Sequence, residues 1–268
     1  MLDFGYYNMD CMQGMKEFPN NYFDLAIVDP PYGDGGGCWS GPERFGQRFD
    51  RYRGPAFTAN STPSPTGGIP DSGGGGYRRN RHITNGLRKG QRPPSWWNVG
   101  GEVRKKIIAW DVAPGKEYFE ELFRVSRNQI IWGGNYFELP ANRCFLIWRK
   151  TNVPENFSMA MCEYAWTSFN DNAKWFELSA VGQQGRFHPT QKPVELYKWL
   201  LTNYAKPGDK ILDTHVGSAS SLIACEDLGF KYVGFEIDAE YYRRGTERIA
   251  AHTAQMTISD LIGDWRFP

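Results

Sequence analysis

The chain has 268 residues, of which 40% are hydrophobic and 15% aromatic, and its formal net charge is +1. This length suits one α/β domain with a substantial core, and the aromatic content excludes a disordered protein. No apolar run reaches membrane-spanning length, no basic and then apolar leader opens the chain, and the five cysteines form no CxxC pair. The four histidines have no cysteine or carboxylate at ligand spacing. We therefore expect a soluble, cytoplasmic protein with reduced cysteines and no metal site.

Two short strands are predicted near the N-terminus, at Tyr6–Asn8 and Asp24–Val28. The second ends on the tetrad Asp29-Pro30-Pro31-Tyr32. A given four-residue string occurs by chance in about one chain per thousand of this length. A carboxylate, two rigid prolines and an aromatic ring can form a pocket for a flat, amino-bearing ring. The alternative is an ordinary turn, because Asp-Pro starts turns readily.

Residues 33–101 are rich in glycine and arginine. They contain 17 Gly and 7 Pro, too many for regular elements, and ten Arg or Lys against four acids. The segment charge is thus +6 (ten minus four), which leaves −5 for the rest of the chain. We predict a single domain over 1–268 with 33–101 as an inserted basic loop. Such loops are usually functional or disordered, so a solvated insertion without a partner is the alternative.

The middle of the chain predicts one helix and three strands. The helix covers Lys116–Val125, since Tyr118, Leu122 and Val125 share a face. A buried strand at Gln129–Trp132 follows and ends at a glycine pair. The strands Cys144–Trp148 and Met161–Thr167 are expected to form an antiparallel pair at a sheet edge.

The C-terminal third predicts a βαβ unit, which makes a parallel sheet. Pro193 suits the first turn of a helix with one apolar stripe. Strands are expected at Ile211-Leu212 and Tyr232–Phe235, joined by a helix over Ser220–Leu228 that Gly229 ends. Asp238 can cap a last helix running to about Ala251.

Two acids mark the strand ends of this unit, where ligands of parallel sheets bind. Asp213 ends the first strand, and Glu236 ends the second, well placed to accept two hydrogen bonds from a ribose. Gly217 lets the backbone approach a ligand, and Ser218 can donate a hydrogen bond. The loop is not G-x-G-x-x-G, so a nucleoside-like ligand carrying an amino acid fits better than a pyrophosphate. An ordinary strand–turn–helix without ligand is the alternative.

Taken together, these strings resemble a known family. The chain is similar to the S-adenosylmethionine-dependent DNA amino-methyltransferases, in the permuted (beta) group where the catalytic tetrad precedes the cofactor loop, and looks most like phage and prophage members. The resemblance covers nearly the whole chain outside 33–101. It rests on Asn8-Met9-Asp10-Cys11, Asp29-Pro30-Pro31-Tyr32, Trp132-Gly133-Gly134-Asn135-Tyr136-Phe137, Cys162-Glu163-Tyr164-Ala165-Trp166-Thr167-Ser168, His188-Pro189-Thr190-Gln191-Lys192-Pro193, Asp213-Thr214-His215-Val216-Gly217-Ser218 and Phe235-Glu236-Ile237-Asp238.

The resemblance implies a Rossmann-like methyltransferase fold, with a mostly parallel sheet, an antiparallel edge hairpin and helices on both faces. It also implies N6 methylation of adenine in duplex DNA by base flipping and direct in-line transfer. Asp29 and the Pro30 carbonyl would accept from the target amino group, Pro31 would help to fix the backbone, and Tyr32 would stack on the base. The implied cofactor residues are Asp10, Thr190, Lys192, Asp213, His215, Gly217, Ser218 and Glu236.

Several of these roles have alternatives. Asp10 equally suits a helix cap, and Lys192 suits a solvated lysine before a helix. The family commonly has Asp-Pro-Phe-x-Gly-Ser-Gly, whereas this chain has Thr214, His215 and Ala219 at the differing places. His215 is expected to pack or stack, and Ala219 leaves the cofactor affinity in doubt.

The expected partner is double-stranded DNA, with a homodimer and a cognate restriction endonuclease suggested by the resemblance. Phosphate contacts are expected from the basic loop, because Arg and Lys neutralise phosphates. The alternatives are cytosine-N4 methylation, an RNA substrate, and a decayed prophage protein that binds DNA or cofactor without turnover. The residues expected to bind DNA are Arg44, Arg48, Arg78, Arg79, Arg81, Arg88 and Lys89.

Overall fold

A computed structural model describes residues 1–33, 111–154, 160–180 and 186–263, with the side chains described up to residue 255. Within these ranges the chain forms one eight-stranded sheet in the order β1-β8-β7-β2-β3-β5-β4-β6. The strands are β1 (Gly5–Asn8), β2 (Phe23–Val28), β3 (Ser126–Trp132), β4 (Phe145–Lys150), β5 (Cys162–Thr167), β6 (Lys174–Leu178), β7 (Lys210–Asp213) and β8 (Lys231–Glu236).

The sheet is mostly parallel. Strands β1, β8, β7, β2 and β3 run parallel to one another. Strand β5 is antiparallel to both β3 and β4, and β6 pairs parallel with β4. The α/β fold expected from the sequence is therefore confirmed. The antiparallel pair lies one strand in from the edge, because β6 adds outside β4.

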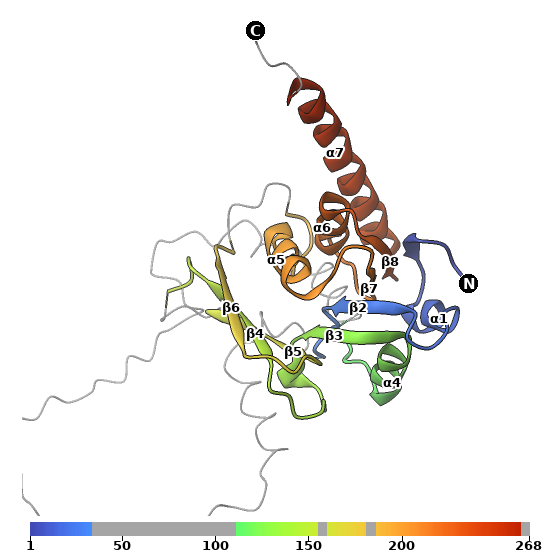
Figure 1. The fold of residues 1–268 in the computed structure, drawn as a ribbon, viewed down its shortest axis with the longest axis vertical. Helices are drawn as coiled ribbons and strands as arrows, with labels where there is room; N and C mark the ends of the chain where they lie inside the picture. The colour runs from blue at the N-terminus through green and yellow to red at the C-terminus, as the bar shows by residue number, and fades with distance from the viewer. Residues whose placement is uncertain (34–110, 155–159, 181–185, 264–268) are drawn as a thin grey trace, which may run out of the picture. The chain divides into compact units, whose positions relative to one another are not determined.

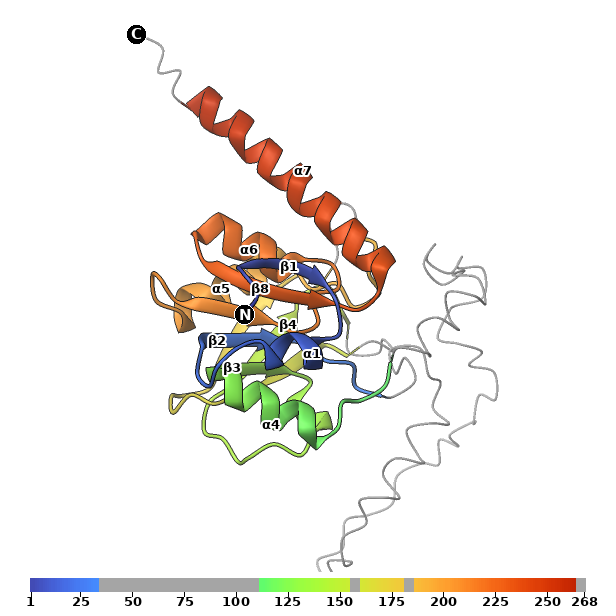
Figure 2. The same cartoon turned by 90° about the vertical axis from the view of Figure 1, so that its right-hand side faces the viewer.

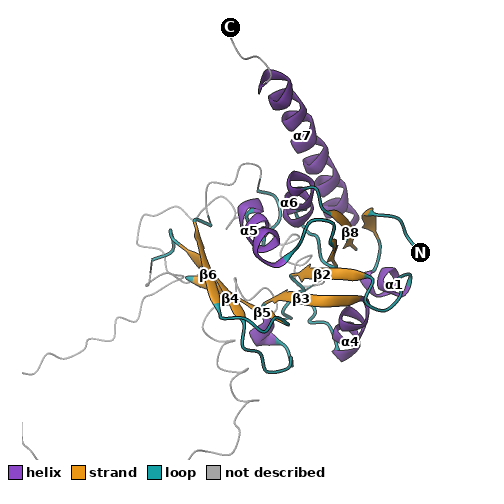
Figure 3. Ribbon diagram, in the orientation of Figure 1, coloured by secondary structure: helices purple, strands orange, loops and turns teal. Residues whose placement is uncertain are grey.

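Helices cover both faces of the sheet (Figures 1, 2 and 3). On one face lie α5 (Val194–Tyr204) and α6 (Ser220–Leu228), and on the other α1 (Cys11–Lys16) and α4 (Lys116–Val125). A single turn of 3₁₀ helix, η3 (Gly134–Tyr136), follows β3. The last helix, α7 (Ala239–Gly263), packs at its start on β1, β8 and α6 and then extends past them (Figure 1).

Strand β2 shows how the sequence fills both cores. Its side chains alternate between the two faces, as the two-residue period of a strand requires. Leu25 and Ile27 pack with α5 and α6, whereas Ala26 and Val28 pack with α1 and α4. All four are at most 2% exposed. Each large apolar side chain buried in this way contributes about 1.5–3 kcal/mol, which makes β2 a central strand of the domain.

The strand order reverses between β7 and β2. From β7 the chain continues through α6 to β8 on one side, and β3 lies on the other side of β2, with α4 on the opposite face. Open α/β sheets bind ligands in the crevice at such a switch point, beyond the carboxyl ends of the strands. Strand β2 is followed there by Asp29, and β7 ends on Asp213.

Several element boundaries differ from the sequence expectation. Pro193 is the residue before α5, with an extended backbone (φ −64°, ψ 143°), and does not lie in its first turn. Helix α7 continues to Gly263 because no glycine or proline interrupts residues 251–262. Strand β6 and helix α1 were not predicted. The basic loop and its seven predicted DNA contacts lie outside the described residues. None of the helices described is both long and apolar enough to cross a membrane.

Candidate active site

Asp29, directly after β2, is held by two side chains. Its Oδ2 accepts a hydrogen bond from Lys192 Nζ at 2.5 Å, and its Oδ1 accepts one from the Tyr32 hydroxyl at 2.8 Å. Burial, followed by the charge of Asp29, raises the pKa of Tyr32 well above its ordinary value, so this hydroxyl stays a donor. Pro30 between them is buried. The tetrad is thus a compact unit that fixes one carboxylate.

The Tyr32 ring packs on the turn after β3. It stacks on Tyr136 with ring centres 4.7 Å apart and planes 13° apart. A Cβ at Gly133 would lie 2.1 Å from Tyr32 Cε1, and Gly133 also has a φ of +66°. Both the close approach and the left-handed backbone require glycine there. The glycine pair after β3 therefore lets the tetrad pack closely.

Lys192 belongs to a chain of alternating charges. It is 4% exposed, and its Nζ lies 3.1 Å from Glu163 Oε2 on β5. Glu163 Oε1 in turn lies 2.6 Å from Lys150 Nζ on β4. Burial alone would lower the pKa of Lys192, but the carboxylates of Asp29 and Glu163 raise it above its ordinary value. Burial opposes ionisation of Glu163, yet the two lysines hold its pKa down to about 2.

A second acidic centre lies at the ends of β7 and β8. Asp213 is 3% exposed and accepts hydrogen bonds from the Ser221 hydroxyl and the His215 amide. Glu236 accepts from the amides of Gly217 and Asp238, each at 2.8 Å. Burial raises the pKa of Asp213 to about 7 despite its two donors, and the charges of Asp29 and Glu236 act in the same direction.

The loop between β7 and α6 is tightly wound. Gly217 has a φ of +56°, and a Cβ there would lie 3.3 Å from the His188 ring. Ala219 also has a left-handed backbone, with a φ of +63°, at the place where the family commonly has glycine. Helix α7 holds this loop, since Arg248 Nη1 donates to the Ser218 carbonyl at 2.7 Å and to Ser220 Oγ at 2.8 Å.

His215 is linked to α4 through Thr214. The Tyr118 hydroxyl lies 2.6 Å from Thr214 Oγ1, which lies 2.9 Å from His215 Nδ1. The His215 ring meets the Tyr118 ring edge to face at 5.4 Å. Burial lowers the pKa of His215 to about 4, so the imidazole is neutral near pH 7.

The remaining predicted cofactor residues make local contacts. Asp10 Oδ1 accepts from the Met12 amide at 2.8 Å and caps α1. Ser218 Oγ lies 3.1 Å from Ser220 Oγ. Thr190 is exposed and its hydroxyl lies 3.2 Å from His188 Nδ1. The structure thus places Asp29, paired with Lys192, and the β7–α6 loop at the carboxyl ends of two neighbouring strands and gives Asp10 a capping role.

Sequence reasoning assigned no role to several residues that support this crevice. Glu163 lies in the Cys162–Ser168 motif, and a carboxylate among the apolar residues of a strand is the signal that could have identified it. Ser221 lies eight positions after its partner Asp213. The partners of the remaining supporting residues lie in distant segments of the chain, so no local pattern indicates those contacts. These supporting residues are Tyr118, Tyr136, Lys150, Glu163, Ser221 and Arg248.

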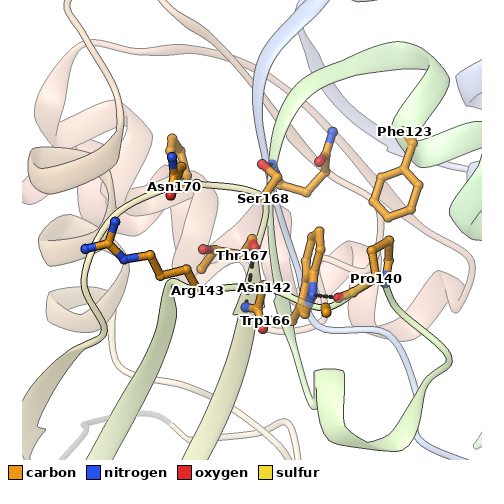
Figure 4. A pocket seen from close by; sticks show the side chains of 11 residues that line it. Phe123, Pro140, Asn142, Arg143, Trp166, Thr167, Ser168 and Asn170 are labelled. Carbon is orange, nitrogen blue, oxygen red and sulfur yellow. Dashed lines mark hydrogen bonds between the residues drawn. The ribbon is translucent and has the colours of Figure 1, made fainter.

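A surface hollow of about 450 Å³ lies elsewhere, lined by residues that include Phe123, Pro140, Asn142, Trp166 and Thr167 (Figure 4). Two of the polar side chains that line it donate hydrogen bonds within the protein. Trp166 Nε1 donates to the Pro140 carbonyl at 2.7 Å, and Asn142 Nδ2 donates to the Cys144 carbonyl. We therefore place the site at the switch point. The described part of the chain has no cluster of three or more His, Cys, Asp or Glu that could hold a metal ion.

Residues 147–247, which include Glu163, Lys192, Asp213 and Glu236, match the family model described as DNA methylase. The sequence matches support a DNA methyltransferase of the N6/N4 family. YubD of Escherichia coli (strain K12) is 24% identical over 259 residues, 97% of this chain and 96% of YubD. The DNA adenine methyltransferase YhdJ of the same strain is 39% identical over 67 residues, 24% of this chain and 23% of YhdJ.

Among solved structures, the M1.HpyAVI–SAM complex is 18% identical, covers 91% of this chain and 98% of its own, and has a TM-score of 0.43. S-adenosyl-L-methionine is the cofactor of the DNA methylase family, which agrees with the cofactor expected from the sequence.

The residues of the crevice fit this cofactor. It carries a cationic sulfonium and an ammonium group, and three buried or partly buried acids face the switch point. Each oxygen of the Glu236 carboxylate takes one backbone donor, which leaves further lone pairs for two hydroxyl groups. The arrangement can therefore hold a cationic nucleoside at β7 and β8 and an amino group at Asp29.

Proposed function

We propose that this protein is an S-adenosyl-L-methionine-dependent DNA methyltransferase that methylates the N6 amino group of adenine in duplex DNA. One observation carries the proposal: Asp29 and Asp213, from opposite ends of the chain, follow neighbouring strands at the switch point of the sheet. A methyl donor held at one acid then faces an amino group held at the other.

The cofactor, when bound, supplies an electrophilic methyl group. Asp213 and Glu236 hold it by charge and by hydrogen bonds to its ribose, while Gly217 allows the loop to approach. Asp29 and the Pro30 carbonyl accept from the target amino group and localise its lone pair. The cofactor would give up its methyl group and leave as a neutral thioether, and the methylated nitrogen would release its extra proton to water. Tyr32 stacks on the base, which must leave the duplex to reach it.

Two observations favour adenine. The tetrad begins with Asp, whereas in the cytosine-N4 enzymes of the resembled family the tetrad more often begins with Ser. The local match to a DNA adenine methyltransferase points the same way. Asp29 is also held by two donors, which suits a carboxylate that accepts from the amino group of either base. A cytoplasmic location, a homodimer and a cognate endonuclease stay predictions.

The decisive experiment is incubation of the full chain with tritiated S-adenosyl-L-methionine and, in parallel reactions, unmethylated duplex DNA or RNA, followed by digestion to nucleosides. We expect the label in N6-methyl-2′-deoxyadenosine from the DNA. Label in N4-methyl-2′-deoxycytidine would overturn the adenine assignment, and label in the RNA reaction alone would overturn the DNA assignment. The absence of label from both reactions would overturn the proposal of a methyltransferase.

Two variants test the division of labour in the same assay. Asp29→Ala is expected to lose methyl transfer while it still binds the cofactor. Asp213→Ala is expected to lose cofactor affinity. Full activity of Asp29→Ala would contradict the catalytic role of the tetrad.

A further inference from the structure

Four charged side chains of alternating sign, Lys150, Glu163, Lys192 and Asp29, form a series of ion pairs that we call the charge chain. The proposed mechanism uses only Asp29 of these four. The charge chain joins four segments: β4, β5, the turn before α5 and the end of β2. Lys192 side-chain atoms are 3% exposed and those of Lys150 are 8% exposed, whereas Asp29 and Glu163 reach 14% and 26%. A buried ammonium group is costly unless a carboxylate compensates it, and both lysines contact a carboxylate: Lys150 contacts Glu163, and Lys192 contacts Asp29 and Glu163.

The geometry aims Lys192 at the catalytic carboxylate. Its Nζ is closer to Asp29, at 2.5 Å, than to Glu163, at 3.1 Å, and it lies 5.3 Å from the centre of the Trp132 ring. With Tyr32 on the other oxygen, both oxygens of Asp29 have a fixed donor. The carboxylate cannot rotate without breaking one of these bonds, yet each oxygen keeps a lone pair for a substrate amino group.

Glu163 limits how strongly Lys192 neutralises Asp29. An ammonium group paired with Asp29 alone would weaken that carboxylate as an acceptor for an amino group. Glu163 shares the ammonium group, and Lys150 in turn compensates Glu163. Two carboxylates and two ammonium groups therefore alternate, so the chain has no net charge and Asp29 keeps its acceptor strength.

We propose that Lys192 is a positioning residue that holds the Asp29 carboxylate aligned for the target amino group, and that Glu163 tunes its effect. This inference deepens the proposed function and rests on it. It differs from the expectation that Lys192 binds the amino-acid end of the cofactor, because it predicts effects on methyl transfer without effects on cofactor affinity.

Removing the cation (Lys192→Met) and removing the neighbouring carboxylate (Glu163→Gln) should move the pH dependence of kcat in opposite directions. Lys192→Met leaves Asp29 beside Glu163 without a cation, so the acidic limb of kcat should move to higher pH. Glu163→Gln removes a neighbouring negative charge and leaves the cation, so the same limb should move to lower pH. The other titratable groups whose charge acts on Asp29 or Lys192 are Tyr32, Tyr118, His188, Tyr197 and Asp213. These groups are common to both variants, so pH shifts of opposite direction in the two variants would come from the charge chain.

The experiment measures kcat for methyl transfer from pH 5 to 9, with cofactor affinity by calorimetry, in the wild type, Lys192→Met, Lys192→Arg and Glu163→Gln. We expect Lys192→Met to lower kcat about 100-fold at pH 7, as a misplaced reacting group does. Its acidic limb should move up by about 1 pH unit or more, and that of Glu163→Gln should move down. Lys192→Arg should recover most of the activity, and cofactor affinity should stay within about threefold throughout.

Two results would overturn the inference. One is a loss of cofactor affinity in Lys192→Met with an unmoved pH limb, which would make Lys192 a cofactor ligand. The other is an equal shift in both variants. If the wild type transfers no methyl group, the proposed function fails instead. The charge chain is then tested by ¹³C carboxyl NMR titration of Asp29, where shifts of its pKa in opposite directions support the chain and equal or absent shifts overturn it.

Discussion

Asp213 is a carboxylate that burial holds near its point of ionisation at neutral pH, with a pKa of about 7. A cationic ligand beside it favours the ionised form, so binding below pH 7 must release a proton. We therefore expect the affinity for S-adenosyl-L-methionine to fall as the pH drops below 7, by up to about tenfold per pH unit. Calorimetric titrations at pH 8, 7 and 6 measure this effect. Asp213→Asn should bind more weakly and show a flat profile, and a flat profile in the wild type would contradict the prediction.

The buried Tyr118 hydroxyl, acting through Thr214, is expected to fix which ring nitrogen of His215 carries the proton. Tyr118 is 3% exposed, and its hydroxyl lies 2.6 Å from Thr214 Oγ1, where either oxygen can donate. Because a buried hydroxyl proton without an acceptor is costly, we expect Tyr118 to donate to Thr214 and Thr214 to donate to His215 Nδ1. We expect the imidazole proton on Nε2, which long-range ¹⁵N NMR would detect. Tyr118→Phe removes the first donor and should admit the Nδ1–H form. A wild-type Nδ1–H signal would contradict the assignment.

At this scale the sequence was most informative about acids at strand ends. Asp29, Asp213 and Glu236 were predicted in their places because short apolar runs end on them. The pairing of Asp29 with Lys192 was not predictable. Lys192 lies 163 positions away in the chain, and the pairing depends on how the end of β2 and the turn before α5 meet. Such a contact has no local sequence pattern.

Helix α7 and the β7–α6 loop show a reciprocal fit. Ala219 carries a methyl group in a left-handed backbone, which costs about 1–2 kcal/mol. A Cβ at Gly245 on α7 would lie 3.4 Å from Ala219 Cβ and 3.0 Å from the Tyr6 hydroxyl oxygen. The absent side chain of Gly245 thus mainly makes room for the Tyr6 side chain, whereas the Ala219 methyl group would be in ordinary contact.

This fit predicts a compensating pair. Gly245→Ala should destabilise the protein by about 1–2 kcal/mol through crowding, as for other overpacked sites. Adding Tyr6→Phe, which removes the hydroxyl oxygen 3.0 Å from the new methyl group, should recover part of that loss, since contacting residues do not behave additively. Urea unfolding of the wild type, both single variants and the double variant gives the coupling energy. A coupling energy of zero would show that the two positions are independent.

Arg248 offers a second test of the same helix. Its two hydrogen bonds hold Ser218 and Ser220 at the start of α6. Arg248→Met should cost about 1.5–3 kcal/mol, the range for hydrogen bonds to charged groups, and should weaken cofactor binding. Arg243→Met is the matched control on α7, because Arg243 pairs with Glu247 in an exposed i,i+4 bridge worth less than about 0.5 kcal/mol. Equal losses in both variants, measured by urea unfolding, would contradict a specific role for Arg248.

Elements were predictable where the apolar pattern was long or had clear ends. Helices α4 and α6 begin and end as expected, since a periodic face defines the first and Gly229, with a φ of +71°, ends the second. Strand β6 was missed because it is an edge strand of five residues with Trp175 70% exposed. Helix α1 has only six residues, and its cap at Asp10 was recognised as one of two alternatives.

For the whole molecule, the main prediction concerns the basic loop. We propose that residues 33–101 supply most of the phosphate contacts, because they carry a charge of +6 (ten bases minus four acids). Deleting residues 36–95 should abolish DNA binding and spare cofactor binding. Fluorescence anisotropy with a labelled duplex, at several salt concentrations, measures the first, and calorimetry the second. Unchanged DNA affinity would refute the assignment.

The strand order was predictable only in part. The βαβ unit of β7, α6 and β8 follows from its spacing, and the antiparallel pairing of β4 with β5 was expected. The neighbouring positions of β2 and β7 follow from the motif order only through the resemblance, because residues 29 and 213 have no local relation. The closing pair, β1 with β8, likewise joins the two ends of the chain.

This joining of the ends has a consequence for biosynthesis. The ribosome releases β1 and β2 first, but their partners β8 and β7 emerge only after residue 210. Until then the early strands have open edges and Asp29 has neither Lys192 nor a methyl donor beside it. A nascent chain therefore cannot assemble the proposed site before β7 and β8 have been made, and a fragment that ends earlier lacks the strand partners of β1 and one partner of β2.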